Sequence, residues 1–343
     1  MAFIANVKIS FFLVLICFVT FSSLHTTTEA CHTTDRVALL DFKSKISEDP
    51  YGLLQTWNQS TDCCTKWEGI GCDSNGRVVR LVRTGGYFRY QGDFEFMIGT
   101  ISPSLSELEF LSWLNLGGHK HLTGTIPPEL GKLSHLTTLY LYDNKLEGSI
   151  PASFQNLHKL KFLQLNDNLL SGTVPANLFQ HMSSLSQLDL SKNQLSGRIP
   201  SSIGKLVSLQ TLDFKQNKFS GSIPTAIGFL KKLSYLTLSN NQISGCIPSS
   251  ISELKSLNVV YLSNNKLTGI PAFLSNTAPL EVLMLDNNML TGNLPDSLGN
   301  LTKLITLSVK NNRLTEQFQL WLKKKYKLKT MLKNNMKKQE LKQ

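Results

Sequence analysis

The strongest constraint on the fold is a motif that recurs about every 24 residues along most of the chain. An asparagine marks each copy, and a glycine and a proline follow it in phase, as in Asn144, Gly148 and Pro151. The repeated asparagines are Asn144, Asn168, Asn193, Asn217, Asn241, Asn265, Asn288 and Asn312. Three residue types kept in phase over so many copies indicate an array of coils, each of which stacks only on its neighbours.

Leucines within each copy indicate one short strand per coil. In Leu139, Tyr140 and Leu141, the alternation of a strand directs both leucines inward and the tyrosine outward. The spacing L-x-x-L-x-L-x-x-N-x-L at this period is the signature of a leucine-rich repeat. The expected fold class is therefore α/β, a solenoid with a parallel sheet on its concave face.

The repeated asparagine and glycine have separate physical roles. The asparagine follows the strand, where its amide can pair turn backbone groups that would otherwise be buried without partners. The glycine permits a turn with positive φ, and the proline fixes φ and ends local pairing. We therefore expect the asparagines to form a ladder of hydrogen bonds through the stack.

The N-terminus has the pattern of a secretory signal. An apolar run from Phe11 to Phe21 is too short to span a bilayer, and small residues precede a cleavage site expected near Ala30. No second apolar segment of the sequence is long enough to cross a membrane. The mature chain is expected to be secreted, without a transmembrane anchor.

Secretion favours disulfides for the cysteines that follow. Four of them fall within a short stretch at the mature N-terminus, namely Cys31, Cys63, Cys64 and Cys72. Two disulfides are expected, and zinc is the weaker alternative because no histidine is suitably spaced. Cys246 is left over, either as a buried thiol or as a cysteine that has lost its partner.

The full repeat pattern, L-x-x-L-x-x-L-x-L-x-x-N-x-L-x-G-x-I-P-x-x-L-G, resembles the plant-specific class of leucine-rich repeats. Residues 57–72 read W-N-x-S-x-D-C-C-x-x-W-x-G-I-x-C, which resembles the N-terminal cap of plant receptor-like proteins and polygalacturonase inhibitors. The order of the first repeats is also similar to secreted plant proteins labelled DNA-damage-repair/toleration. The resemblance implies the disulfides Cys31–Cys63 and Cys64–Cys72. An amphipathic capping helix is expected over Asp35–Ile46.

The expected organisation is a signal peptide (1–30), a disulfide-bonded cap (31–76), leucine-rich repeats (77–322, an irregular first repeat plus about nine) and a lysine-rich tail (323–343). The tail contains nine lysines and one glutamate, so it carries +8 of the net charge of +11. It is a truncated or misread end, a basic helix on a membrane, or a disordered tail. Because the remainder carries only about +3, a nucleic-acid partner is not expected.

Two departures from the repeat lie inside the array. Residues 84–98 replace a regular turn with a longer aromatic-rich insertion, which either packs over the first coils or forms a flap toward a ligand; we favour packing. Residues 269–271 make the seventh full repeat one residue short, and the convex side should tighten there.

Catalysis is not expected. The sequence lacks the common hydrolase, metalloprotease and nucleotide-binding motifs, and its histidines fall at different phases of the repeat. Asp189 and Asp213 occupy equivalent positions on adjacent strands, about 5 Å apart, which could raise one pKa. A polar ladder exposed to water is the favoured interpretation over acid–base chemistry. No cofactor or metal is expected.

Binding is better supported, because strand alternation directs a strip of variable side chains outward on the concave face. Trp113, Tyr140, Tyr142 and Phe162 fall on three adjacent strands and form an exposed aromatic patch, unless they only pack against each other or the insertion. The candidate ligand-binding residues are Trp113, Tyr140, Tyr142, Phe162, Gln164, Asp189, Asp213, Lys215, Tyr235 and Tyr261.

The expected function is a secreted, non-enzymatic module that binds a protein or peptide on the concave face, in the cell wall or apoplast or at the plasma membrane. The resemblance implies a role in plant defence, with a fungal polygalacturonase as the leading partner. The alternative is a receptor component that acts with a separate membrane kinase through its ectodomain. Asn58 and Asn300 lie in sequons for N-glycosylation.

Overall fold

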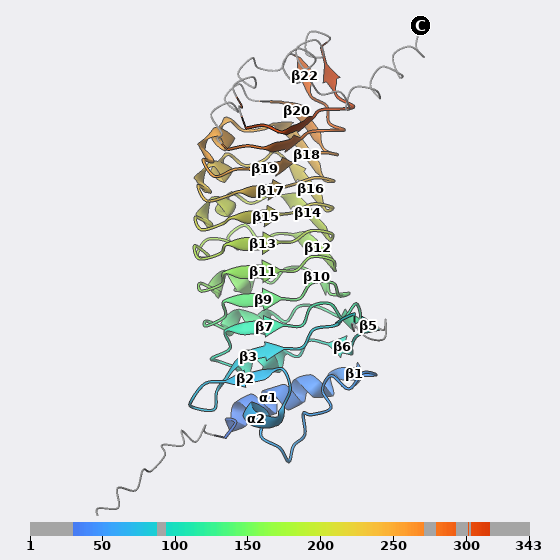
Figure 1. Ribbon diagram of the computed structural model, residues 1–343, viewed down its shortest axis with the longest axis vertical. Coiled ribbons are helices and arrows are strands. Elements are labelled where there is room, and N and C mark those ends of the chain that lie inside the picture. Colours follow the sequence, from blue (N-terminus) through green and yellow to red (C-terminus); the bar gives the residue numbers. More distant parts are fainter. Residues whose placement is uncertain (1–29, 88–93, 271–278, 293–300, 302, 316–343) are drawn as a thin grey trace, which may run out of the picture.

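The computed structural model describes residues 30–87, 94–270, 279–292, 301 and 303–315. Within them, eleven strands stack into one sheet that runs the length of the molecule (Figure 1). In spatial order the strands are β2 (Ile70–Cys72), β3 (Val78–Val82), β7 (Trp113–Asn115), β9 (Thr138–Tyr140), β11 (Phe162–Gln164), β13 (Gln187–Asp189), β15 (Thr211–Asp213), β17 (Tyr235–Thr237), β19 (Val259–Tyr261), β21 (Val282–Met284) and β23 (Thr306–Ser308). From β3 onward all pairs are parallel and in register.

Six of the described coils continue from their strand into a second sheet, and most of the described coils then form a 3₁₀ helix. The second sheet holds β10 (Glu147–Gly148), β12 (Leu169–Thr173), β14 (Gln194–Arg198), β16 (Lys218–Gly221), β18 (Gln242–Cys246) and β20 (Lys266–Gly269). The 3₁₀ helices are η1 (Pro103–Glu107), η2 (Pro128–Lys132), η3 (Ala152–Asn156), η4 (Ser201–Lys205), η5 (Thr225–Phe229) and η6 (Ser249–Glu253). The remaining strands are β1 (Ile46–Glu48), β4 (Gly86–Tyr87), β5 (Phe94–Glu95), β6 (Ile98–Thr100), β8 (Leu122–Thr123), β22 (Thr291–Gly292) and β24 (Arg313–Leu314).

The interior is a continuous column of aliphatic side chains. Leu139, Leu141 and Leu146 have no exposed surface, and the equivalent leucines of neighbouring coils extend the same core. Tyr140, between the two strand leucines, points outward and is half-buried. The solenoid expected from the repeat is confirmed. Since one coil cannot bury its own apolar face, its stability depends on the coils on both sides.

The asparagine ladder is also confirmed. The Asn217 amide donates to the carbonyl oxygens of Leu190, Phe214 and Lys215 at 2.9, 3.3 and 3.4 Å. Its Oδ1 accepts from the Leu195 N–H of the preceding coil at 2.9 Å. Each amide therefore joins its own turn to its neighbour, which pairs backbone groups that water cannot reach.

The shortened repeat changes the local backbone. The repeated glycines adopt positive φ in the described coils, for example 74° at Gly221, but Gly269 does not. The pairing of β18 with β20 also shifts register between Gly245 and Cys246. Pro271, the proline of this repeat, lies outside the described residues.

The N-terminal cap closes the first coil with helix α1 (Thr33–Ser44) and the short helix α2 (Cys63–Lys66). The expected helix over Asp35–Ile46 starts two residues earlier and ends sooner, since Ile46 pairs with Gly99 in a strand. Both implied disulfides are present, Cys31–Cys63 and Cys64–Cys72. The sulfurs of Cys31, Cys63 and Cys64 lie within 4.8 Å of one another, and these bonds account for that proximity without zinc.

The described ends of the 84–98 insertion pack against the cap and first coils, as favoured from the sequence. Met97 is fully buried, and the Phe96 ring lies 5.5 Å from Tyr51 and 4.7 Å from His121. Residues 88–93, the tip, lie outside the described residues.

Cys246 is exposed, so the expectation of a buried thiol is wrong. It is the last residue of β18, and its Sγ lies 3.9 Å from the Thr268 hydroxyl of the next coil. The signal segment before Ala30 and the lysine-rich tail lie outside the described residues. In the part of the chain that is described, no helix combines the length and apolarity needed to cross a bilayer.

Candidate ligand-binding surface

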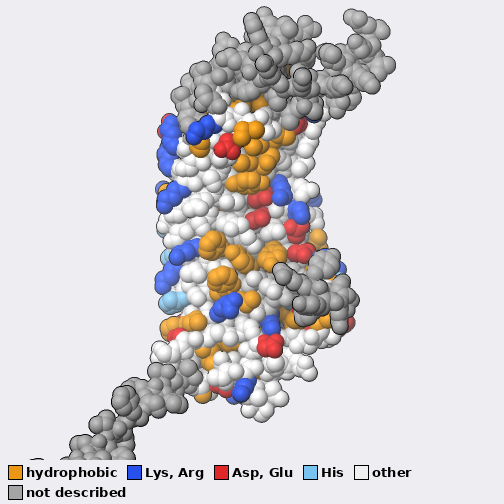
Figure 2. Space-filling model, viewed as in Figure 1, with side chains coloured by type: hydrophobic (Ala, Val, Ile, Leu, Met, Phe, Trp, Pro, Cys, Tyr) orange, Lys and Arg blue, Asp and Glu red, His pale blue; other side chains and the backbone are white. Residues whose placement is uncertain are grey.

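All ten candidate binding residues lie on the outward face of the eleven-stranded sheet or, for Tyr142 and Lys215, in the turns directly after its strands. This surface is called the sheet face below. Two positions on each strand point outward because they alternate with the buried residue between them, as Gln187 and Asp189 do around Leu188. Figure 2 shows two hydrophobic areas on this face with acidic side chains between them. The structure thus brings the candidates onto one surface.

The first hydrophobic area is an aromatic cluster formed by Trp113, Tyr140, Tyr142 and Phe162. The Trp113 and Tyr140 ring centroids are 6.2 Å apart, with an edge-to-face angle of 78°. Tyr140 and Tyr142 make a similar contact at 6.2 Å. Trp113, Tyr140 and Tyr142 therefore do contact each other, and Phe162 lies on the adjacent strand β11, where it pairs in register with Thr138. Trp113 is nevertheless 36% exposed.

Two residues that sequence reasoning missed hold this cluster. The Arg80 guanidinium lies over the Trp113 ring, 5.8 Å from its centroid, on the neighbouring strand β3. Gly117 lies beneath Tyr142, where an added Cβ would come within 2.6 Å of the ring. Gly117 is not at the repeated glycine position, and this departure from the repeat is the sequence feature that could have identified it.

The second hydrophobic area contains Tyr235 and Tyr261. Their ring centroids are 5.8 Å apart on adjacent strands β17 and β19. Val259 and Val282 continue the area as half-buried side chains. This area and the aromatic cluster both belong to a rigid sheet, so little conformational entropy would be lost when a partner docks.

Between the two areas lie the carboxylates of Asp189 and Asp213, which are paired in register on β13 and β15. Asp189 Oδ1 accepts from the Ser191 N–H at 2.9 Å, and Asp213 Oδ1 from the Lys215 N–H at 3.0 Å. The Lys215 ammonium lies 3.2 Å from Asp213 Oδ2. Gln164 precedes this pair on β11 and is half-buried.

The interpretation of this pair as a water-exposed ladder is wrong for Asp213, which is only 6% exposed. Burial raises the pKa of both carboxyls; the Asp213 charge raises that of Asp189 further, and Lys215 opposes the shift at both. The sequence suggested that the pKa of one of these two aspartates is raised, whereas the structure raises the pKa of both. Lys192, whose charge also acts on Asp213, is itself paired with Asp167 at 2.8 Å. With only the Lys215 ammonium left to balance two carboxylates, the group retains one negative charge when both acids are ionised.

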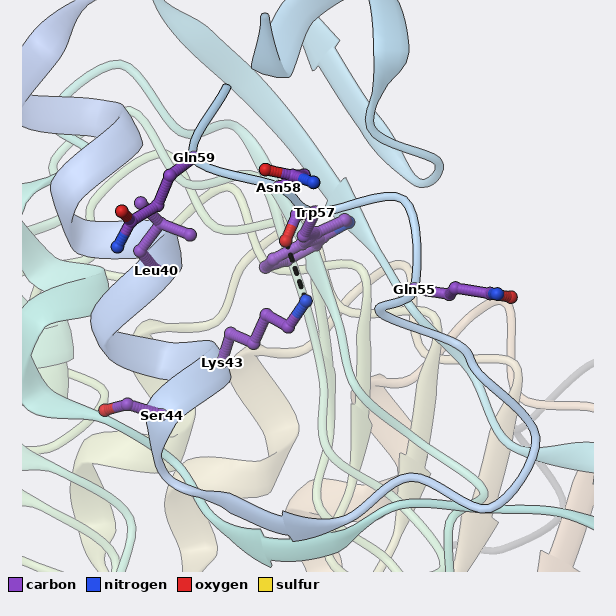
Figure 3. Close-up of a pocket in the computed structure, with 7 residues that line it drawn as sticks. All are labelled: Leu40, Lys43, Ser44, Gln55, Trp57, Asn58 and Gln59. Carbon is purple, nitrogen blue, oxygen red and sulfur yellow. Dashed lines mark hydrogen bonds between the residues drawn. The ribbon is translucent and has the colours of Figure 1, made fainter. Parts of the chain in front are cut away.

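A separate pocket lies in the cap, away from the sheet face (Figure 3). Its volume is about 460 Å³, and it is lined by Leu40, Lys43, Ser44, Gln55, Trp57, Asn58 and Gln59. Lys43 donates to the carbonyl oxygens of Leu54 and Trp57 at 2.9 and 2.7 Å, so its ammonium already connects α1 to the following loop.

Asn58, one of the two predicted glycosylation sites, is exposed and accepts from the Ser60 N–H and hydroxyl. Asn300, the other, lies outside the described residues. Glycosylation at both asparagines stays a prediction.

Three family descriptions match the chain. Residues 189–341 match a leucine-rich repeat region, residues 32–73 a leucine-rich repeat N-terminal domain and residues 111–170 a leucine-rich repeat. Over the residues that the structure describes, all three agree with the architecture given above.

Curated plant proteins are similar over part of their length. DNA damage-repair/toleration protein DRT100 of Arabidopsis thaliana is 38% identical over 133 residues, which make up 37% of this chain and 36% of that protein. Leucine-rich repeat protein FLOR 1 of the same plant is 36% identical over 117 residues, 34% of this chain and 32% of that protein. The chain thus spans about a third of the length of these two relatives.

Solved structures extend the likeness to most of the chain. The ectodomain of the Arabidopsis thaliana receptor kinase GASSHO1/SCHENGEN3, in complex with Casparian strip integrity factor 2, has a TM-score of 0.74 and 32% identity over 82% of this chain and 33% of that chain. The receptor kinase HAESA from Arabidopsis, in complex with the peptide hormone IDA and the co-receptor SERK1, has a TM-score of 0.68 and 33% identity over 82% and 46%. A plant ice-binding protein has a TM-score of 0.69 and 28% identity over 83% and 88%. Together with the repeats and the disulfide-bonded cap, these likenesses show that the chain belongs to the plant leucine-rich-repeat proteins that carry a leucine-rich-repeat N-terminal domain.

Proposed function

We propose that this protein is an extracellular recognition module that binds a peptide or a segment of a protein on the sheet face. The observation that carries the proposal is the aromatic cluster, which keeps Trp113 36% exposed on a rigid sheet. Aromatic side chains on a preformed surface are typical anchors of an interface. The two disulfides of the cap suit an oxidising, extracellular compartment.

Two roles fit this binding function. The likeness to ectodomains described in complex with peptides supports a receptor-type component that recognises a peptide and works with a separate membrane kinase. The cap motif of residues 57–72 supports the alternative, an inhibitor that covers a fungal polygalacturonase. Binding to a panel of purified receptor-kinase ectodomains, and inhibition of purified polygalacturonases, distinguish the two roles.

The variant Trp113→Ala/Tyr140→Ala tests the binding surface itself. Loss of two central aromatic anchors is expected to weaken binding of any partner found by about 30-fold or more, corresponding to at least about 2 kcal/mol. The matched control is Phe229→Ala, which removes an aromatic ring that is 65% exposed at the end of η5, off the sheet face. Equal affinities of the double variant and the wild type for every partner would exclude the sheet face as the binding surface.

A further inference from the structure

The chemistry of the sheet face is ordered along the stack. The aromatic cluster occupies β7, β9 and β11, the carboxylates of Asp189 and Asp213 lie on β13 and β15, and the rings of Tyr235 and Tyr261 lie on β17 and β19. One negative group therefore separates two hydrophobic areas, as Figure 2 shows. A ligand that covers all three must present apolar, charged and apolar groups in that order.

The acidic group is suited to a cation from outside. Each carboxylate is held in place by a backbone N–H, so neither has to be ordered when a ligand arrives. Lys215 lies 3.2 Å from Asp213 and leaves one negative charge on the pair. Its side chain is 38% exposed, so it can swing aside. Partial burial also strengthens an ion pair relative to one in bulk water.

The strand positions also set the distances between the carboxylate pair and the two hydrophobic areas. Neighbouring strands lie about 4.8 Å apart, so the carboxylate pair is about 12 Å from Tyr140 and about 10 Å from the midpoint of Tyr235 and Tyr261. An extended peptide advances about 3.3 Å per residue, so these distances correspond to about three to four residues on each side.

Resting on the proposed function, we infer that the preferred ligand is an extended peptide segment with one cationic side chain between two apolar side chains, each about four residues away, because that even spacing points all three side chains toward the sheet face. Arginine suits the central position best, because its planar guanidinium can donate to two carboxylates at once.

A peptide-display selection on the full chain tests this inference, using a random library of 12-residue peptides. The wild type is expected to enrich peptides with a central arginine or lysine at this spacing. The Asp189→Asn/Asp213→Asn variant should lose the cationic preference and keep the apolar one. An enriched peptide, resynthesised, should bind Asp213→Asn about 10-fold more weakly and Lys215→Gln more tightly than the wild type. If Asp213 and Lys215 acted only in folding, the two substitutions would not change the peptide affinity in opposite directions.

Replacement of the central arginine by citrulline, which is neutral and of similar shape, tests the same contact without a change in the protein. The affinity of the peptide for the wild type should fall about 10-fold, and its affinity for the Asp189→Asn/Asp213→Asn variant should not change. If sheet-face peptides lack a cationic residue, or citrulline has no effect, this inference is wrong and the proposed function stands. If no peptide is enriched, or enriched peptides bind Trp113→Ala/Tyr140→Ala as well as the wild type, the proposed function fails and the inference fails with it.

Discussion

Replacement of Asn217 by alanine is expected to lower the free energy of unfolding by about 3 kcal/mol, whereas Ser220→Ala should change it by less than about 0.5 kcal/mol. Asn217 is 9% exposed, and its amide pairs three carbonyl oxygens and one N–H in two coils. Alanine leaves the Leu195 N–H and the Leu190 carbonyl without that partner where water cannot easily replace it. Ser220 donates one 3.4 Å bond to Gly197 from a partly exposed position.

Urea denaturation of both variants and the wild type, followed by circular dichroism, measures the difference. The two substitutions lie three residues apart in one coil, so they test the same part of the stack with unequal numbers of hydrogen bonds. Equal denaturation midpoints would show that the amide ladder contributes little to stability. A loss in the asparagine variant alone would show that the repeated asparagine is retained for its hydrogen bonds.

Most of the fold could be predicted because its determinants are local and repeated. The leucine spacing of each coil sets its strand and core residues, and the same pattern in the next coil sets the partner, as Leu188 and Leu212 show by pairing in register. The asparagine contacts follow from the same repetition where a regular coil lies on both sides, as at Asn217. Asn144 follows the irregular first coils, and within the described residues its Oδ1 has no hydrogen-bond partner. The cap departs from this logic, and its helix boundaries were accordingly less accurate.

Features that depend on contacts between unlike residues could not be predicted in the same way. The burial of Asp213 reflects the side chains of adjacent strands and Lys215, and a position in the repeat gives no information about them. The support of Trp113 by Arg80 crosses from the irregular first repeat to the regular array. His119 was treated as one of several scattered histidines, yet its side chain has no exposed surface.

His119 joins the two ends of the insertion. Its Nε2 lies 2.9 Å from the Arg83 carbonyl oxygen, just before the insertion, and its Nδ1 accepts from the Met97 N–H at 3.2 Å. This pattern requires the neutral ring with its proton on Nε2. Burial lowers the pKa of His119 from 6.5 to about 4, although the Arg83 hydrogen bond opposes the shift.

The lowered pKa predicts acid destabilisation of the folded chain. Above about pH 6.5 the ring is neutral in both states, whereas between 6.5 and about 4 the unfolded chain binds a proton that the folded chain does not. The free energy of unfolding should therefore fall as the pH falls through this window, by about 3 kcal/mol in total. The raised pKa values of Asp189 and Asp213 act with the opposite sign, because protonation of those carboxyls favours the folded state.

The variant His119→Gln isolates the histidine from these opposing groups. A glutamine amide can also donate and accept, so the variant should fold, with lower stability at pH 7.5 than the wild type. Its stability should then fall less between pH 6.5 and 4, with the difference between the two profiles approaching about 3 kcal/mol. His158→Gln, which makes the same substitution at an exposed ring, serves as the control for the substitution itself. Urea denaturation at each pH measures all three profiles, and a glutamine variant with the same acid slope as the wild type would rule out His119 as the source.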